Sequence, residues 1–329
     1  MTSTSIARRT LIAAGAAVLS LGLMPFAHAA WPEKPITIVV GYAAGGSVDA
    51  VARLISTPLS QRLGQSVVIE NVGGAGGAVG AAKVARASTD GYTFMVGSGS
   101  EVAIAWAVNP ALKYNGLNDL APVGLISTSP MVLVGNKSVP ANTLSALLQY
   151  GKANRGKLSL ATSGVGTPLH LLLEYINRKT GTDILHVPYR SASSIIQDVI
   201  GGRVDLSILT LSTALPFISS GQLQAFAVTG KEAAPALPAV PPLAQQATLQ
   251  EDAFDLWFGM LAPAGVPQPL IDRMNKELNA VLQQPDVIDA LKKLGMTPSS
   301  GTVGQFGSYI RADSAKYQRI IKDAGITVN

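Results

Sequence analysis

The feature that most constrains the fold is the alternation of short β-branched runs with longer stretches of helical periodicity. Residues Ile36–Val40 predict a buried strand, and apolar residues between Val48 and Leu59 then recur at helical spacing. Further strands are predicted at residues 67–70 and 92–96, with a helix between them. Strands that alternate with helices indicate an α/β architecture.

A second strand–helix series follows a change of register near residue 123. Strands are predicted at residues 158–161, 185–187 and 204–208, and residues 256–261 resemble a returning strand followed by helices. We therefore expect a first lobe at residues 30–125 and 253–329, and a second lobe at residues 126–252. Two chain crossings between two lobes predict a hinge, with the ligand bound in the interlobe cleft.

The first 29 residues are expected to be a signal peptide rather than part of this fold. Arg8 and Arg9 precede an apolar stretch from Leu11 to Phe26, and Ala27-His28-Ala29 fits a cleavage site. The apolar stretch is short for a membrane span. We expect export to the periplasm, by the Sec route rather than the Tat route, because the residues around the arginine pair fit a twin-arginine signal only loosely.

Charge and residue counts argue against several classes of protein. The chain has 25 Lys and Arg against 20 Asp and Glu; removing Arg8 and Arg9 with the leader leaves 23 against 20. This near balance does not indicate a nucleic-acid partner. The chain has no cysteine, and only His170 and His186 remain after the leader. Disulfides, a metal site and other cofactors are therefore not expected.

The turn after the strand at residues 158–161 has the features of an anion-binding helix start. Gly164 and Gly166 permit a sharp turn, Thr167 is suited to cap the next helix, and Pro168 suits its first position. Backbone N–H groups at such a start, with the hydroxyls of Ser163 and Thr167, can hold an anion. A strand–helix turn that binds nothing is the open alternative.

The loop Gly45-Gly46-Ser47 repeats this arrangement after the first strand. Asp49 and Arg53 follow at a spacing of one helical turn. We expect these two side chains to pair on the helix face and to have a structural role.

Two enzymatic interpretations are weaker. The glycine-rich segment from Gly74 has Val79 where a dinucleotide-binding motif needs glycine. No nucleophile elbow surrounds Ser163, and we expect His170 to be a structural hydrogen-bond donor. The chain is therefore not expected to be an enzyme, although an exported serine hydrolase using Ser163 and His170 stays as an alternative.

Short motifs along nearly the whole mature chain, from about Trp31 to Ile326, resemble one family. They are Trp31-Pro32-Glu33-Lys34-Pro35-Ile36, Gly45-Gly46-Ser47-Val48-Asp49 with Ala52-Arg53, Val68-Ile69-Glu70-Asn71, Gly74-Ala75-Gly76-Gly77, Asp90-Gly91-Tyr92-Thr93, Ser163-Gly164-Val165-Gly166-Thr167-Pro168-Leu169-His170, His186-Val187-Pro188-Tyr189-Arg190, Gly201-Gly202-Arg203-Val204-Asp205, Trp257-Phe258-Gly259 and Ala262-Pro263-Ala264-Gly265. This set resembles the Bug-type solute receptors of tripartite tricarboxylate transporters.

The resemblance implies a two-lobed type II periplasmic binding protein that captures a small organic carboxylate and delivers it to a membrane permease. In that family a ligand carboxylate typically lies between the lobes. The residues of this chain then expected to bind the ligand are Tyr42, Ala44, Gly45, Gly46, Ser98, Ser163, Gly164, Gly166, Thr167, Tyr189 and Asp205. A monomer is expected, and a sensor that serves a two-component kinase is an alternative to transport.

Two departures from the family pattern bear on the ligand. Ala43-Ala44 stands where the family commonly has two prolines, which removes a constraint on φ and some bulk from the loop. Ile208-Leu209-Thr210 lacks the second acid that many relatives carry after the Val204-Asp205 pair. An ammonium group would need such an acid, so we expect a carboxylate without an ammonium: a dicarboxylate, a tricarboxylate or an aromatic acid.

Overall fold

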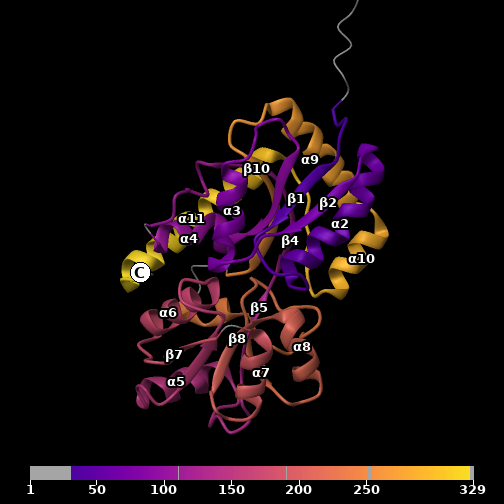
Figure 1. Ribbon diagram of the computed structural model, residues 1–329. Coiled ribbons are helices and arrows are strands. Elements are labelled where there is room, and N and C mark those ends of the chain that lie inside the picture. Colours follow the sequence, from indigo (N-terminus) through magenta and orange to yellow (C-terminus); the bar gives the residue numbers. More distant parts are fainter. Residues whose placement is uncertain (1–30, 110, 190, 250–253, 327–329) are drawn as a thin grey trace, which may run out of the picture. The chain divides into compact units, whose positions relative to one another are not determined.

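The strands form two mixed sheets, one built from both ends of the chain and one from its middle (Figure 1). The computed structural model describes residues 31–109, 111–189, 191–249 and 254–326. The expected signal peptide, residues 1–29, lies outside the described residues. From Lys34 onward the chain makes up one compact unit, which contains both sheets.

The first sheet has the strand order β11-β4-β10-β3-β1-β2. Its strands are β1 (Ile36–Val40), β2 (Val67–Asn71), β3 (Thr93–Ser98), β4 (Leu120–Ser129), β10 (Leu256–Pro263) and β11 (Thr297–Pro298). Strand β1 lies parallel to both β2 and β3, whereas β10 runs antiparallel between β3 and β4. The predicted strand at residues 36–40 is therefore confirmed, and it lies inside the sheet, which explains its largely apolar sequence.

The second sheet has the order β7-β6-β8-β5-β9. Its strands are β5 (Met131–Gly135), β6 (Ser159–Thr162), β7 (Leu185–Pro188), β8 (Leu206–Thr210) and β9 (Gln224–Val228). Strand β6 is parallel to β7 and β8, so the carboxyl ends of these three strands meet at one edge.

Helices connect the strands in both sheets. The longer ones are α2 (Ser47–Leu63), α3 (Ala78–Ala85), α5 (Leu144–Ala153), α6 (Pro168–Thr180), α7 (Ala192–Ile200), α8 (Leu211–Ser219), α9 (Gln268–Leu282), α10 (Pro285–Lys293) and α11 (Val303–Ala324). A π-helical turn at Ser100–Ile104 and the short helix α4 (Ala105–Val108) follow β3. Among the described helices, none combines the length and the apolar character that crossing a membrane requires.

The chain passes from the first sheet to the second at Pro130. Strand β4 pairs with β10 along its length as far as Ser129, and β5 begins at Met131 in the other sheet. The crossing thus lies beyond the boundary expected at residue 125, because hydrogen bonding to β10 extends the strand past the apolar residues that suggested it. The chain returns to the first sheet between β9 and β10.

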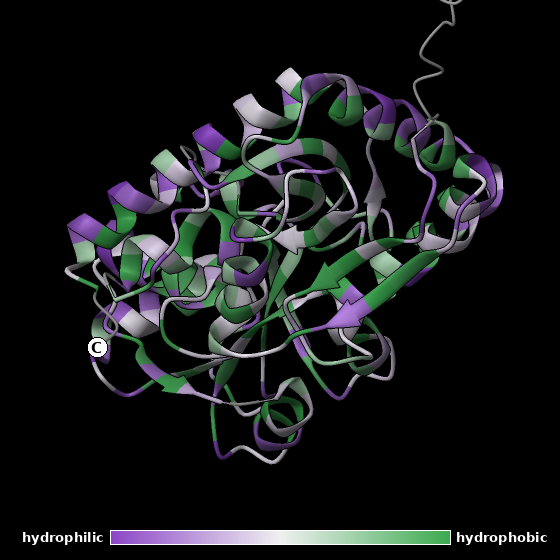
Figure 2. Cartoon of the chain, turned by 45° about the horizontal axis from the view of Figure 1, so that its top comes forward, coloured by the Kyte–Doolittle hydropathy of each residue, from purple (hydrophilic) through white to green (hydrophobic). Residues whose placement is uncertain are grey.

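The central strands are largely hydrophobic, whereas the long helices show alternating hydrophilic and hydrophobic bands (Figure 2). One buried cluster includes residues of the second sheet and of α6, and extends to Tyr317, Ile320 and Ile321 of α11. In the first sheet, Trp257 is 1% exposed and its indole Nε1 donates to Asp313 Oδ2 at 2.7 Å. These clusters hold the loops at the strand ends on rigid elements.

Candidate functional site

The loop between β1 and α2 carries four predicted ligand residues: Tyr42, Ala44, Gly45 and Gly46. Ala44, Gly45 and Gly46 are exposed. Gly46 is the N-cap of α2 and has no side chain, and no side chain of the described chain caps this helix. The helix start therefore presents backbone donors that an anion could satisfy.

Asp49, in the first turn of α2, ties this loop to the helix. Its Oδ2 accepts from the Gly45 N–H at 2.8 Å and from Arg53 Nε at 2.9 Å. Its Oδ1 accepts from Asn71 Nδ2 at 2.9 Å. The hydrogen bond from Arg53, above the opposing effect of burial, lowers the pKa of Asp49 to about 2. The expected pair of Asp49 and Arg53 is present, and it also fixes the loop.

Tyr42, in the loop after β1, and Ser98, at the end of β3, meet at a buried carboxyl group. The Tyr42 hydroxyl lies 2.7 Å from Glu101 Oε2, and the Ser98 hydroxyl donates to the same oxygen at 2.7 Å. The Ser98 N–H donates to Glu101 Oε1 at 2.7 Å. Burial is the largest cause that raises the pKa of Glu101, whose side chain is fully buried. Both predicted ligand hydroxyls are therefore engaged with the protein.

Sequence reasoning did not find Glu101. It lies in the π-helical turn after β3. This conformation is often found at functional sites, but no residue pattern predicts it. The only local signal was an acid directly after the predicted strand and its Gly97-Ser98-Gly99-Ser100 loop.

The turn from Ser163 to Thr167 lies between β6 and α6, as predicted. Thr167 is the N-cap of α6, its hydroxyl accepting from the His170 N–H at 3.4 Å, and Pro168 occupies the first helical position. The Thr167 hydroxyl donates to the Gly164 carbonyl at 2.8 Å. Ser163 is exposed, and no hydrogen bond of its hydroxyl is found within the described chain. Of the two hydroxyls, that of Ser163 is the one left to face a ligand.

Two histidines, His170 and His186, support this turn. The rings of His170 and His186 are stacked with centroids 4.1 Å apart. His170 Nδ1 accepts from the Gly166 N–H at 3.1 Å, so toward the turn the ring is a structural acceptor, whereas a structural donor was expected. His186 Nε2 lies 2.6 Å from Thr162 Oγ1, which accepts from the Gly164 N–H at 3.2 Å. Burial, and next the neighbouring His170, lower the pKa of His186 from 6.5 to about 4.

Tyr189 follows β7 at the same edge of the second sheet. Its N–H donates to the Thr162 carbonyl at 2.9 Å, which holds it next to the Ser163 turn. Its hydroxyl lies 2.7 Å from Asp198 Oδ2. The structure thus brings together Tyr189 and the predicted residues of the turn.

Asp205 lies away from these residues. It precedes β8, and β8 is parallel to β6, so Asp205 is at the amino ends of the strands whereas the Ser163 turn leaves the carboxyl end. Asp205 Oδ2 accepts from the Ser159 N–H at 2.8 Å and from its hydroxyl at 2.7 Å. The expectation that Asp205 is near the ligand is thus not supported by its placement.

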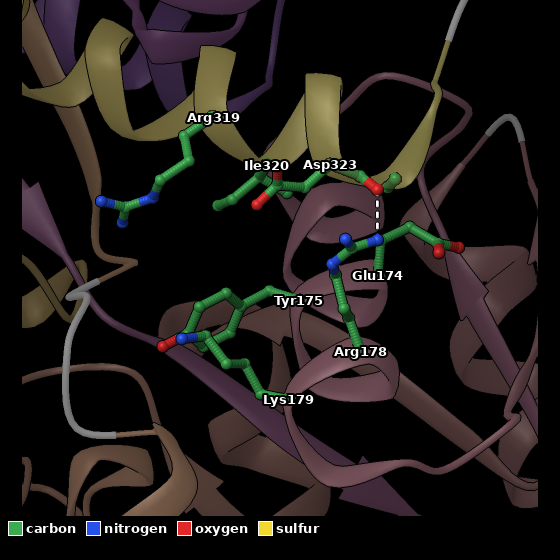
Figure 3. A pocket seen from close by; sticks show the side chains of 8 residues that line it. Glu174, Tyr175, Arg178, Lys179, Arg319, Ile320 and Asp323 are labelled. Carbon is green, nitrogen blue, oxygen red and sulfur yellow. Dashed lines mark hydrogen bonds between the residues drawn. The ribbon is translucent and has the colours of Figure 1, made fainter.

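A cavity of about 360 Å³ lies elsewhere, between α6 and α11 (Figure 3). Tyr175 and Lys179 extend toward it from α6 and Arg319 extends from α11, while Arg178 donates to the Asp323 carbonyl. The cavity residues from α6 belong to its later turns, whereas the Ser163 turn leads into its first turn. This cavity is therefore not the predicted ligand site.

Apart from Asp205, the predicted residues form two groups, one at the Gly45 loop of the first sheet and one at the Ser163 turn of the second. The first group offers backbone N–H donors at the uncapped start of α2, and the second offers the Ser163 hydroxyl beside the start of α6, which Thr167 caps. Among the described residues no hydrogen bond joins Ser163 to His170, and no cluster of His, Asp or Glu has the form of a metal site. The arrangement suits the binding of an anion more than nucleophilic catalysis.

Comparison with known proteins identifies related chains. A family model described as the tripartite tricarboxylate transporter family receptor matches residues 51–326. The structure of R. palustris Rpa4515 with adipate is 31% identical, with a TM-score of 0.81, over 90% of this chain and 99% of that chain. MatC from Rhodopseudomonas palustris with bound malate is 30% identical, with a TM-score of 0.77, over 88% and 100%. The periplasmic binding protein BugD is 31% identical, with a TM-score of 0.76, over 90% and 99%.

These similarities extend over both sheets, so the expected two-lobed fold and the resemblance to Bug-type receptors are confirmed.

Proposed function

This chain belongs to the receptor family of the tripartite tricarboxylate transporters, and from that premise we propose that it captures a small dicarboxylate between its lobes and delivers it to a membrane permease. The observation that carries the proposal is that related structures of the same fold hold adipate and malate. Because BugD is a periplasmic binding protein, we place this chain in the periplasm as well, after removal of residues 1–29.

The proposed site joins the Gly45 loop to the Ser163 turn. One ligand carboxylate would accept from the uncapped start of α2, and the other from the Ser163 hydroxyl and the backbone of its turn. Asp205 is left out of this site because it is bonded to Ser159 at the other end of the strand. Closure on a ligand is favoured because both lobes contact it only in the closed state.

The buried acids beside the Gly45 loop support a ligand without an ammonium group. Asp49 and Glu101 are 3% and 0% exposed, and both are hydrogen-bonded within the protein. Neither acid is placed to accept from a ligand ammonium, whose burial without a carboxylate partner would be costly. A dicarboxylate makes no such demand.

The first test is a thermal-shift and calorimetric screen of residues 30–329 with adipate, malate, a monocarboxylate, aspartate and a sugar. A dicarboxylate at 100 times its dissociation constant is expected to stabilise the protein by about 2.7 kcal/mol. Binding of aspartate or the sugar alone would contradict the proposed ligand class.

The site itself is tested by Ser163→Ala, with Ser145→Ala on the exposed face of α5 as the matched control. Loss of one hydrogen bond to a charged group is expected to weaken dicarboxylate binding by roughly tenfold or more, and the control should bind like the wild type. Equal affinity of the two variants would remove Ser163 from the site. Delivery is tested by growth of a deletion strain on the dicarboxylate that binds.

A further inference from the structure

The two predicted ligand loops, the Gly45 loop and the Ser163 turn, share one kind of hydrogen bond, from a glycine N–H to a side chain of the following helix. In the first, the N–H of Gly45, at φ 88°, donates to the side chain of Asp49 at 2.8 Å. In the second, the N–H of Gly166, at φ 75°, donates to the ring of His170 at 3.1 Å. Each glycine directly precedes the N-cap of a helix, and each acceptor is the third residue of that helix.

This hydrogen bond sets the direction of the peptide groups that enter the helix start. Both glycines have φ in the left-handed region, where a chain without further support has several accessible conformations. Gly166 is buried. If the acceptor were removed, the Gly166 N–H would have no partner, because water does not reach it. The acceptor therefore holds the turn in the conformation that presents its outer face.

The bond also assigns the proton of His170. An imidazole nitrogen that accepts a hydrogen bond carries no proton, so the neutral ring is protonated at Nε2. Nε2 lies 3.5 Å from Glu174 Oε1, on the next turn of the same helix. The stacked ring of His186 supports the other glycine of the turn, through Thr162 and the Gly164 N–H.

We propose that His170 is a positioning residue for ligand capture, and that it acts in the second lobe as Asp49 acts in the first. It contacts the Gly166 N–H and not the ligand, and its Nδ1 holds the Ser163 turn in its binding conformation. This inference rests on the proposed function, since it concerns the same site.

The test compares His170→Asn with His170→Leu. The amide oxygen of asparagine can replace Nδ1 as the acceptor for Gly166, whereas leucine has a similar size and no acceptor. Calorimetry with adipate and malate is expected to show affinity within about threefold of wild type for His170→Asn and roughly tenfold weaker for His170→Leu, as expected for one hydrogen bond. His170→Gln, whose amide reaches the Nε2 position instead, is expected to behave like His170→Leu and replaces it if that variant does not fold.

Rescue by asparagine is the result that a merely structural ring would not give. Equal affinities for all three variants and the wild type would overturn the proposal, as would an equal loss in His170→Asn and His170→Leu. If wild-type protein binds no carboxylate at all, the proposed function itself has failed. A wild type that binds normally, with variants that also do, refutes only the role of His170.

Discussion

At the scale of single residues, the protonation state of Glu101 affects how Tyr42, in the loop between β1 and α2, is held. The one hydroxyl proton of Tyr42 faces two acceptors, Glu101 Oε2 at 2.7 Å and the Gly76 carbonyl at 2.9 Å. If Glu101 is protonated, it donates to Tyr42, and Tyr42 can donate to Gly76, so every group is satisfied. Burial raises the pKa of Glu101 and favours the same state.

We predict that Glu101→Gln removes a pH dependence of stability. The pKa of Glu101 is higher in the folded chain than its ordinary value of 4.5. As pH rises above 4.5, the unfolded chain releases this proton first, so the folded protein loses stability. The amide reproduces the protonated acid and does not titrate. From pH 5 to pH 8, the melting temperature should therefore fall less in Glu101→Gln than in wild type. Exposed Glu232→Gln serves as the control, and an unchanged pH dependence in Glu101→Gln would refute the protonated state.

A second residue-scale prediction concerns acid pH and His186. Its pKa is lowered to about 4 in the folded state, so unfolding takes up a proton between about pH 6.5 and 4, and stability is lost as pH falls through that range. In His186→Gln, the side-chain amide can keep the contact to Thr162 and does not titrate. The denaturation free energy of this variant, measured from pH 7 to pH 4, should decline less steeply than that of wild type. A parallel decline in both proteins would show that other groups cause it.

At the scale of elements, the glycine-rich segment that resembles a nucleotide motif serves close packing. A Cβ atom at Gly80 would lie 2.7 Å from the Gly41 Cα, and one at Gly41 would lie 2.8 Å from the Gly77 carbonyl oxygen. Helix α3 therefore packs backbone to backbone against the end of β1. The glycines position the loop between β1 and α2, which contains Tyr42.

We predict that Gly80→Ala destabilises the protein by about 1–3 kcal/mol, because one of the two backbones must move. The displaced loop should also weaken dicarboxylate binding. Gly304→Ala is the matched control: it also lies in a helix, with no atom nearer than 4.0 Å to the added Cβ. Urea denaturation gives the free energy of unfolding of both variants. A Gly80→Ala variant as stable as the control would contradict the close packing.

At the scale of the whole molecule, one apolar cluster links distant parts of the chain. Phe254, which is fully buried, lies just before β10, with its ring 4.8 Å from that of Tyr175 in α6 and 6.2 Å from that of Tyr317 in α11. The same cluster includes Leu160 and Leu206 from the middle of the second sheet. Helix α11, at the end of the chain, therefore shares a core with the second sheet.

We predict that Phe254→Ala lowers stability by about 3–5 kcal/mol and shifts the whole unfolding transition. Leu185→Ala is the control, because Leu185 is 51% exposed and should change stability by less than about 0.5 kcal/mol. Calorimetry would show one transition displaced as a unit. Two transitions of which only one moves would mean that the cluster stabilises a single lobe.

Much of the fold could be predicted because its signals are local. The apolar run of β1, the start of α2 at Ser47, and the cap formed by Thr167 and Pro168 all depend on neighbours within a few residues. The ends of β4 could not be predicted in this way, because its pairing with β10 extends it to Ser129.

The candidate site was predicted less completely, and two residues show why. Asp205 was expected near the Ser163 turn, although an acid that precedes a strand parallel to β6 must lie at the opposite edge. Glu101 was missed, because its importance depends on Tyr42, 59 residues away, and on burial that no pattern reports.

The sequence by itself determined the alternation of strands and helices, the glycine turns and the family, since each of these is written in short stretches of residues. The tertiary structure alone decided which donors are left to a ligand. Glu101 takes up the hydroxyl of Tyr42, 59 residues away, because folding brings the two side chains together in space. A buried polar group must find a partner, and only the folded chain shows which partner it has found.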